Sequence, residues 1–435
     1  MKKIISTLLA CAILAELTSC GAAIKNIKPE LTDPELEYTV EEIEALSKNE
    51  MKISDYGLPA LYKYFDGKVK IGVTTNGFEF ENYPTDDVAK GCLKNYNVYV
   101  LGNELKSDYC NPAEGVYNFT AGDAFVETAK AGGAELRGHT IVWHSQVPAW
   151  WFKADPQDEA SLEECYENGR LATREQLKER LKTYINELIP RYKDSIKYWD
   201  VCNEVLNDTA SSVRRISDGS YWADIFGDVD GDGYYDDYIE YAFNTVREAG
   251  GEDLVLIINE YNMEWQDSKA QLMYDTVERL LRKGVRIDGV GFQSHIGVDV
   301  NVETFRRNIE RIYGLSKVYD ECFPEHKGNF RVQITELDMN MFVGELSDGA
   351  FYKWSDEDFE RQAEKYYELV DMFLDFADEG AIDLILFWGS DDEHSWLNSF
   401  PKLRRNAALL VDRDLTVKPS YWAVARAAVE HESGK

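Results

Sequence analysis

The sequence has few cysteines and too few basic residues to balance its acidic ones. Beyond residue 20 only five cysteines remain, at positions 92, 110, 165, 202 and 322, and none form a CxxC pair. This spacing indicates neither a disulfide scaffold nor a zinc site. The 47 basic residues face 79 acidic ones, for a net charge of −32. Such a chain would be repelled by nucleic acid and by anionic lipid surfaces, so we expect a neutral partner and a solvated acidic surface.

The sequence also lacks an apolar run long enough to span a bilayer. A short apolar run follows Lys2 and Lys3, which is typical of an export signal. The run ends in Leu17-Thr18-Ser19-Cys20, which resembles the lipobox of bacterial lipoproteins. Residues 1–20 are therefore predicted to be a lipoprotein-type signal peptide, with lipidation at Cys20. A plain secretory signal with an incidental cysteine is the alternative. In the first case the protein is a bacterial cell-envelope lipoprotein, outer-facing or periplasmic, held to the membrane only through its lipid anchor.

No Ser- or Pro-rich linker interrupts residues 56–432, which we interpret as one domain of a monomeric protein. Residues 21–55 are polar, acidic and broken by Pro29 and Pro34. They suit a tether followed by a first helix near residues 40–48. The chain is 44% hydrophobic and 13% aromatic, which excludes a disordered protein.

Short apolar runs alternate with long amphipathic segments, an order typical of parallel strands joined by crossover helices. One such segment runs from residue 174, with Thr173 as a plausible N-cap. Eight strand–helix repeats predict an α/β protein with a closed (β/α)₈ TIM barrel, whose functional groups lie at the C-terminal ends of the strands. The eight apolar runs are residues 70–75, 97–103, 136–144, 196–204, 254–262, 289–295, 331–339 and 383–390.

Two glutamates end predicted strands, Glu204 on the fourth and Glu336 on the seventh. Either one alone could be a helix cap or an ion-pair partner. Together they would face each other across the barrel mouth, as the acid and the nucleophile of a retaining glycosidase do at a separation of roughly 5–5.5 Å. We expect His295 and Asp338 to flank Glu336 and to favour its charged form. Asn203 is an uncharged donor suited to the sugar 2-hydroxyl.

Aromatic and polar side chains at other strand ends fit a sugar substrate. Indole rings pack on the flat C–H faces of sugars, and amides, acids and bases bind the hydroxyls. The predicted walls are Trp143, Trp388 and Trp396, and the predicted rim consists of Asn103, Lys106, His139 and Gln146.

The motifs RGHTIVWHSQVPAWW, WDVCNEVLND, INEYN, GVGFQSH, ITELDM and FWGSDDEHSWL, in this order, resemble the motif series of glycoside hydrolase family ten. Members of that family are chiefly endo-β-1,4-xylanases that retain the anomeric configuration on a (β/α)₈ barrel without a cofactor. The resemblance implies Glu204 as acid/base, Glu336 as nucleophile, Tyr261 on the leaving-group side, and xylan and xylo-oligosaccharides as substrates. It also implies a set of residues around the sugar at the cleavage point: Lys106, His139, Trp143, Gln146, Asn203, Gln293, His295, Trp388 and Trp396.

Two other functions stay open at this point. The first is hydrolysis of β-1,4-glucan or mixed-linkage glucan, which depends on whether the wall near Trp388 and Trp396 admits the extra CH₂OH of glucose. The second is a non-catalytic lipoprotein that captures oligosaccharides, although binding alone needs neither carboxylate. Gly102 stands where the family carries a carboxylate for a sugar one unit farther from the cleavage point, so that subsite is expected to bind weakly.

An acidic loop at residues 227–238 follows the first nine positions of a calcium loop. The ligands would be Asp228, Asp230, Asp232 and Asp236. Position twelve is Ile239 rather than a glutamate, so a solvated acidic loop without a metal is favoured.

Overall fold

Eight parallel strands close into a barrel in the computed structural model, which describes residues 39–65, 67–76, 85–344 and 352–434. Each strand pairs in parallel with its neighbours, and the last strand pairs with the first to close the ring. Every predicted apolar run overlaps one of these strands, so the predicted (β/α)₈ barrel is confirmed. The barrel strands are β1 (Lys70–Thr75), β2 (Val98–Leu101), β3 (Glu135–Gly138), β4 (Ile196–Asn203), β5 (Val255–Glu260), β6 (Gly289–Phe292), β8 (Arg331–Asn340) and β9 (Ile382–Phe387).

A ninth strand, β7 (His295–Gly297), was not predicted. It follows β6 after Gln293 and Ser294, and it pairs with the C-terminal part of β8, so that His295 lies opposite Asp338. The N-terminal part of β8 pairs with β6 itself. Ser294 takes a φ of 62°, a left-handed conformation that turns the chain between β6 and β7.

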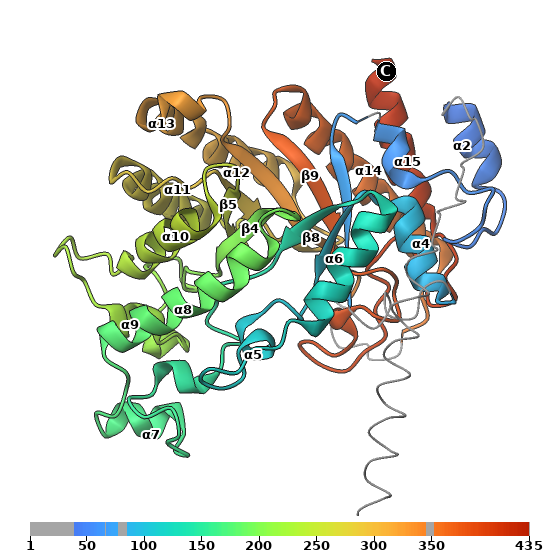
Figure 1. Cartoon of the computed structure of the whole chain (residues 1–435). Helices are drawn as coiled ribbons and strands as arrows, with labels where there is room; N and C mark the ends of the chain where they lie inside the picture. The colour runs from blue at the N-terminus through green and yellow to red at the C-terminus, as the bar shows by residue number, and fades with distance from the viewer. Residues whose placement is uncertain (1–38, 66, 77–84, 345–351, 435) are drawn as a thin grey trace, which may run out of the picture.

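Helices surround the barrel (Figure 1). Thr173 caps the long helix α8, as predicted, and forms a capping box with Gln176. None of the helices in the described residues is long and apolar enough to cross a membrane. The helices are α2 (Val40–Leu46), α4 (Asp87–Asn95), α5 (Ser107–Cys110), α6 (Thr120–Gly132), α7 (Leu162–Glu167), α8 (Arg174–Tyr192), α9 (Trp222–Phe226), α10 (Asp237–Gly250), α11 (Asp267–Arg282), α12 (Val302–Tyr313), α13 (Leu315–Cys322), α14 (Asp356–Asp378) and α15 (Pro419–Ser433).

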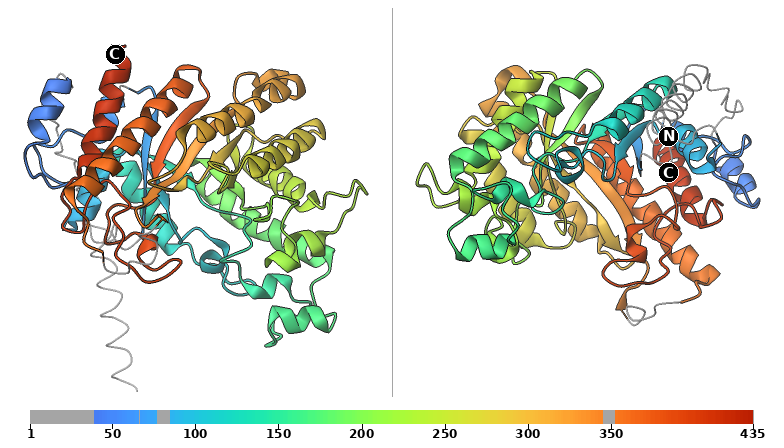
Figure 2. Two further views of the ribbon diagram at one scale, coloured as in Figure 1. Left: turned by 180° about the vertical axis from the view of Figure 1, so that it is seen from behind. Right: turned by 60° about the horizontal axis from the view of Figure 1, so that its bottom comes forward.

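Helix α2, the first helix of the described residues, lies against the C-terminal helix α15, which in turn packs on α14 (Figures 1 and 2). It falls within residues 40–48, where the sequence predicts the first helix, and Thr39 caps it. The predicted signal peptide and Cys20 lie outside the described residues.

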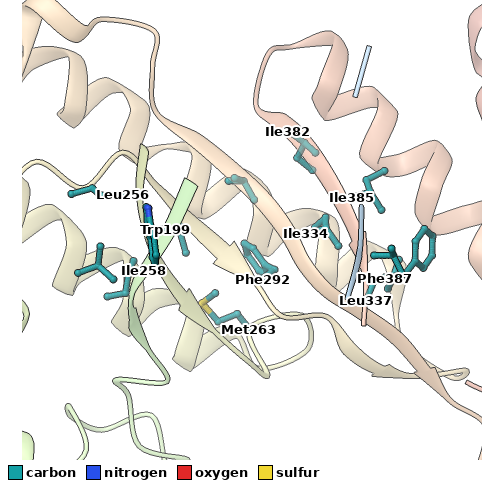
Figure 3. Packing of buried hydrophobic residues seen from close by; sticks show 14 of the residues in the cluster. Trp199, Leu256, Ile258, Met263, Phe292, Ile334, Leu337, Ile382, Ile385 and Phe387 are labelled. Atoms are coloured by element: carbon teal, nitrogen blue, oxygen red, sulfur yellow. The ribbon is translucent and has the colours of Figure 1, made fainter. Parts of the chain in front are cut away.

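The main core lies between the strands and the helices that cover them. Figure 3 shows some of its buried side chains, including Leu256, Ile258, Phe292 and Ile334 from the strands. A parallel strand that is covered on both faces has no polar side. This is why these strands are apolar and could be predicted from apolar runs in the sequence.

The interior of the barrel is polar at one level. Arg137 on β3 forms a buried ion pair with Asp200 on β4, and its Nε donates to Gln333 Oε1 on β8 at 3.3 Å. Because β3 and β8 are not neighbours in the sheet, this bond crosses the inside of the barrel. The pair supports the floor of the site described next.

Candidate active site

Glu204 and Glu336 both lie at the C-terminal ends of the barrel strands, as the barrel topology requires. Glu204 follows β4 directly and has a φ of 54°, while its backbone N–H donates to Asn259 O on β5 at 2.9 Å. Glu336 lies within β8 and is 4% exposed. A left-handed conformation at a non-glycine residue is held in place by its surroundings and is frequent at functional sites.

A chain of side-chain amides links the two glutamates. Asn203 Nδ2 donates to Glu204 Oε1 at 3.3 Å, and Asn259 Nδ2 donates both to Asn203 Oδ1 at 2.9 Å and to Glu336 Oε1 at 2.7 Å. Gln293 Nε2 donates to Glu204 Oε1 at 3.1 Å. The two carboxylates are therefore oriented by one connected set of uncharged donors.

His295 contacts the carboxylate oxygen of Glu336 that Asn259 does not bind. Its Nε2 lies 3.2 Å from Glu336 Oε2 and its Nδ1 lies 3.0 Å from Asp338 Oδ1. Trp396 Nε1 donates to the other oxygen of Asp338 at 2.7 Å. Burial lowers the pKa of His295, but Asp338 and Glu336 outweigh burial and raise it well above its usual value. The protonated ring, an imidazolium, donates to both carboxylates.

Glu204 has a different neighbourhood, because the side chains around it are mostly uncharged. His144 Nε2 lies 3.8 Å from Glu204 Oε2. Burial, assisted by Arg214, lowers the pKa of His144 to about 4, so this ring is neutral at neutral pH. The Glu204 side chain is 15% exposed and that of Glu336 is 5% exposed. Glu204 is thus the carboxylate with more access to solvent.

Tyr261, the predicted leaving-group-side residue, is connected to Glu204 through Arg214. Arg214 Nε donates to Glu204 O at 3.0 Å, and its other nitrogen donates to the Tyr261 hydroxyl. That hydroxyl donates to Asp208 in turn. Burial and the bond to Asp208 raise the pKa of Tyr261, so the phenol stays protonated. Arg214 fixes the position of Tyr261 relative to the glutamate.

Three predicted rim residues bind one another. Lys106 Nζ donates to Gln146 Oε1 at 2.7 Å and lies 4.7 Å from the centre of the Trp143 ring. Gln146 Nε2 donates to Asn103 Oδ1 at 3.1 Å. Burial lowers the pKa of Lys106, while Glu336 and Glu204 act to raise it. A cation on this rim faces the two carboxylates and can bind sugar hydroxyls.

Aromatic rings form a wall of the site next to His139 and His295. Trp388 packs edge-on against His139 at 5.2 Å and against His295 at 6.2 Å, and Trp396 packs on His295 at 4.8 Å. His139 Nδ1 is 2.9 Å from buried Asp200 Oδ2. Burial raises the pKa of Asp200, but its charged partners outweigh burial and hold it below its usual value.

These contacts bring together every residue that the sequence analysis placed in the sugar site, although they do not test the role of each one. Asn259, His144 and Arg214 are also part of the site and were not predicted to be. The first two stand in the quoted motifs INEYN and RGHTIVWHSQVPAWW, where only the contacts distinguish them from neighbouring polar residues. Arg214 lies in the loop after β4, where no sequence pattern marked it.

The acidic loop does not assemble the four predicted calcium ligands. Asp236 is buried and pairs with Arg279, and Lys283 Nζ pairs with Asp232 at 2.5 Å and also with Asp230. The carboxylates that lie within 4.8 Å of one another are those of Asp228, Asp230 and Asp237. Lysine and arginine therefore neutralise part of the negative charge of the loop.

Comparison with known proteins places this barrel in a family. The profile of glycosyl hydrolase family 10 matches residues 60–427. Endo-1,4-beta-xylanase C of Paenibacillus barcinonensis is 37% identical over 392 residues, which is 90% of this chain and 33% of that protein. The thermostable celloxylanase of Thermoclostridium stercorarium is 36% identical over 370 residues, covering 84% of this chain and 87% of that protein.

The fold is shared at the level of structure as well. A family 10 structure from Paenibacillus barcinonensis superposes with a TM-score of 0.76 at 38% identity, covering 85% of this chain and 97% of that one. The chain therefore belongs to glycosyl hydrolase family 10. It spans about a third of the length of the Paenibacillus barcinonensis xylanase C.

Proposed function

We propose that this protein is an endo-β-1,4-xylanase that cleaves xylan with retention of the anomeric configuration. The observation that carries the proposal is the pair of glutamates, each in its own hydrogen-bonding environment and joined by Asn203 and Asn259. Retention requires one carboxyl group that carries a proton and one that does not. The family match and the xylanase relatives support xylan as the substrate.

In the first step Glu336 attacks the anomeric carbon and Glu204 gives its proton to the leaving oxygen. The His295 imidazolium and the Asn259 amide donate to Glu336 and keep it ionised for this attack. The product of the step is a covalent glycosyl-enzyme, with the shortened chain released from the side of Tyr261.

In the second step Glu204, now ionised, takes a proton from water, and the water attacks the anomeric carbon and releases Glu336. In each turnover Glu204 gives up one proton and takes one back, which is consistent with its greater exposure and with the neutral His144 beside it. The two inversions give net retention.

Variants of the two glutamates test the roles separately. Glu336→Ala should lose activity on every substrate, because no nucleophile remains. Glu204→Ala should lose about 10²–10⁴-fold on xylan. It should still form the glycosyl-enzyme from an aryl xylobioside whose leaving phenol is acidic enough to need no proton, and added azide should restore its turnover. Near-normal xylan hydrolysis by either variant would refute the assignment.

The substrate itself is tested by product profiling on xylan, arabinoxylan, glucuronoxylan and cellulose, with NMR following the anomer released first. We expect xylan to be cut internally into short oligosaccharides and the β-anomer to appear first. Faster hydrolysis of cellulose would favour the glucanase alternative. An initial α-anomer would contradict the two-carboxylate mechanism.

We also propose that the protein is exported and held on the bacterial envelope through a lipid on Cys20, and that it acts as a monomer. The N-terminal sequence supports the anchor through its basic start, short apolar run and Leu17-Thr18-Ser19-Cys20 motif. A surface anchor would keep a xylan-cutting barrel next to the cell that takes up the products.

A further inference from the structure

Glu264 has a buried carboxyl group that the proposed reaction does not use. It lies next to the backbone between Gln293 and His295, the side chains that contact Glu204 and Glu336. Glu264 stands in the loop between β5 and α11 and has no exposed surface. Its Oε1 accepts a hydrogen bond from the backbone N–H of Ser294 at 2.6 Å. Among the described residues, its Oε2 is buried and has no hydrogen-bond partner. A buried carboxyl group with one free oxygen is costly, so its presence calls for a reason.

Ser294 is the residue between the two side chains that contact the glutamates. Gln293 donates to Glu204, and His295 contacts Glu336. Ser294 has a φ of 62°, and this turn sends Gln293 and His295 to their separate partners. A left-handed conformation at serine persists only where neighbouring groups hold it. The bond from Ser294 N–H to Glu264 is such a restraint.

We propose that Glu264 is a positioning residue for the reaction: by binding the Ser294 backbone it fixes Gln293 against Glu204 and His295 against Glu336. The inference rests on the proposed xylanase function. Through one hydrogen bond to the backbone, a residue outside the sugar site would set the positions of the side chains that contact both glutamates.

The charge of Glu264 also acts on His295. The charged groups that act on Glu264 are Lys269 from α11 and His295 from β7. Burial raises the pKa of Glu264 to about 7, against the lowering effect of its hydrogen bonds and of these two cations. Above that pH the carboxylate adds negative charge next to His295 and supports its imidazolium form.

Two substitutions separate the hydrogen bond from the charge. Glu264→Met keeps the side-chain length and suits a buried site, but it removes the acceptor of the Ser294 N–H. Glu264→Gln keeps an acceptor and removes the charge. In Glu264→Met we expect kcat on a soluble xylo-oligosaccharide to fall roughly 10–100-fold with little change in KM, because the groups that move act on the carboxylates rather than on substrate binding. Glu264→Gln at pH 6 should keep kcat within about threefold of the unmodified protein.

A matched control is Asp288→Asn, which removes another buried carboxylate that precedes β6 at its far end and binds Leu256 N at 2.9 Å. It should lower Tm and leave kcat unchanged. A Glu264→Met protein that retains kcat, or a Glu264→Gln protein that loses as much as Glu264→Met, would overturn the proposal.

The ¹⁵N shifts of the His295 ring give a readout that does not need activity. In Glu264→Met the titration of His295 should move to lower pH, and its bonded proton signals should broaden or shift. If the unmodified protein hydrolyses no xylan, the proposed function fails and the NMR comparison still decides this inference. Identical His295 signals in both proteins would refute it.

Discussion

Replacing Gly291 by alanine should disrupt catalysis without touching a catalytic residue. A Cβ at position 291 would lie 2.3 Å from Asn259 Oδ1 and 2.8 Å from Thr335 Cγ2. Asn259 must move, and it then loses its bonds to Glu336 Oε1 and Asn203 Oδ1, which are 2.7 Å and 2.9 Å long. A hydrogen bond to a charged group contributes roughly 1.5–3 kcal/mol, so kcat/KM should fall about 10–100-fold.

The assay compares hydrolysis of a xylo-oligosaccharide with thermal unfolding in the same preparations. Gly289→Ala is the matched control, because Gly289 lies on the same strand as Gly291, at the end away from the site, and its Cβ would lie 2.4 Å from Arg331 O on β8. Both variants should lose stability, by about 1–3 kcal/mol. Only Gly291→Ala should lose activity at a temperature where both are folded.

A double mutant tests the stated cause of the effect. In an Asn259→Ala protein the space beside residue 291 is open, so adding Gly291→Ala should cost much less activity than it costs in the unmodified chain. Full additivity of the two effects, or a folded Gly291→Ala protein with normal kcat/KM, would refute the reasoning.

Three further predictions concern charge and location. Folding raises the pKa of Glu264 from 4.5 to about 7, so its contribution to stability is complete below pH 4.5 and is lost as the pH rises to about 7. Glu264→Gln should therefore gain up to ~3 kcal/mol relative to the unmodified protein between pH 4.5 and 8 in urea unfolding, and a constant difference would contradict this. Calcium should leave the Tm of the unmodified protein unchanged, because Lys283 neutralises Asp230 and Asp232. In the Lys283→Ala variant, added calcium should raise the Tm. Cys20→Ala should move the exported protein from the membrane to the soluble fraction, and unchanged membrane association would exclude the lipid anchor.

The barrel could be predicted from the sequence because each strand is a short apolar run bounded by polar residues. The predicted boundaries were too long where the chain leaves the sheet but stays apolar. The third run was expected to reach residue 144, whereas β3 ends at Gly138 and the segment beyond it forms the mouth, where a bridge from Val142 to Cys202 replaces the regular pairing with β4. Strand β7 has three residues and exists because it pairs with β8, which local sequence does not reveal.

The chemistry of the site could be predicted in outline, because carboxylates, amides and tryptophans at strand ends are rare together. What could not be predicted is which carboxylate each amide contacts. Asn203 and Asn259 have the same side chain and both follow apolar runs. Their different bonds depend on the registers of β4 and β5, in which the two residues lie opposite each other. Arg214 reaches Glu204 and Tyr261 from a loop, a contact set only by the tertiary fold.

The roles proposed for the two glutamates can be compared with the charges next to each of them. Glu336 contacts one nitrogen of the His295 imidazolium, and Asp338 contacts the other. If Glu336 took up a proton, the cation would keep only Asp338 as a charged partner among these two. Glu204 instead faces His144, whose pKa of about 4 leaves that ring neutral at neutral pH. In the proposed mechanism, the imidazolium beside Glu336 and the neutral ring beside Glu204 agree with attack by Glu336 and proton donation by Glu204.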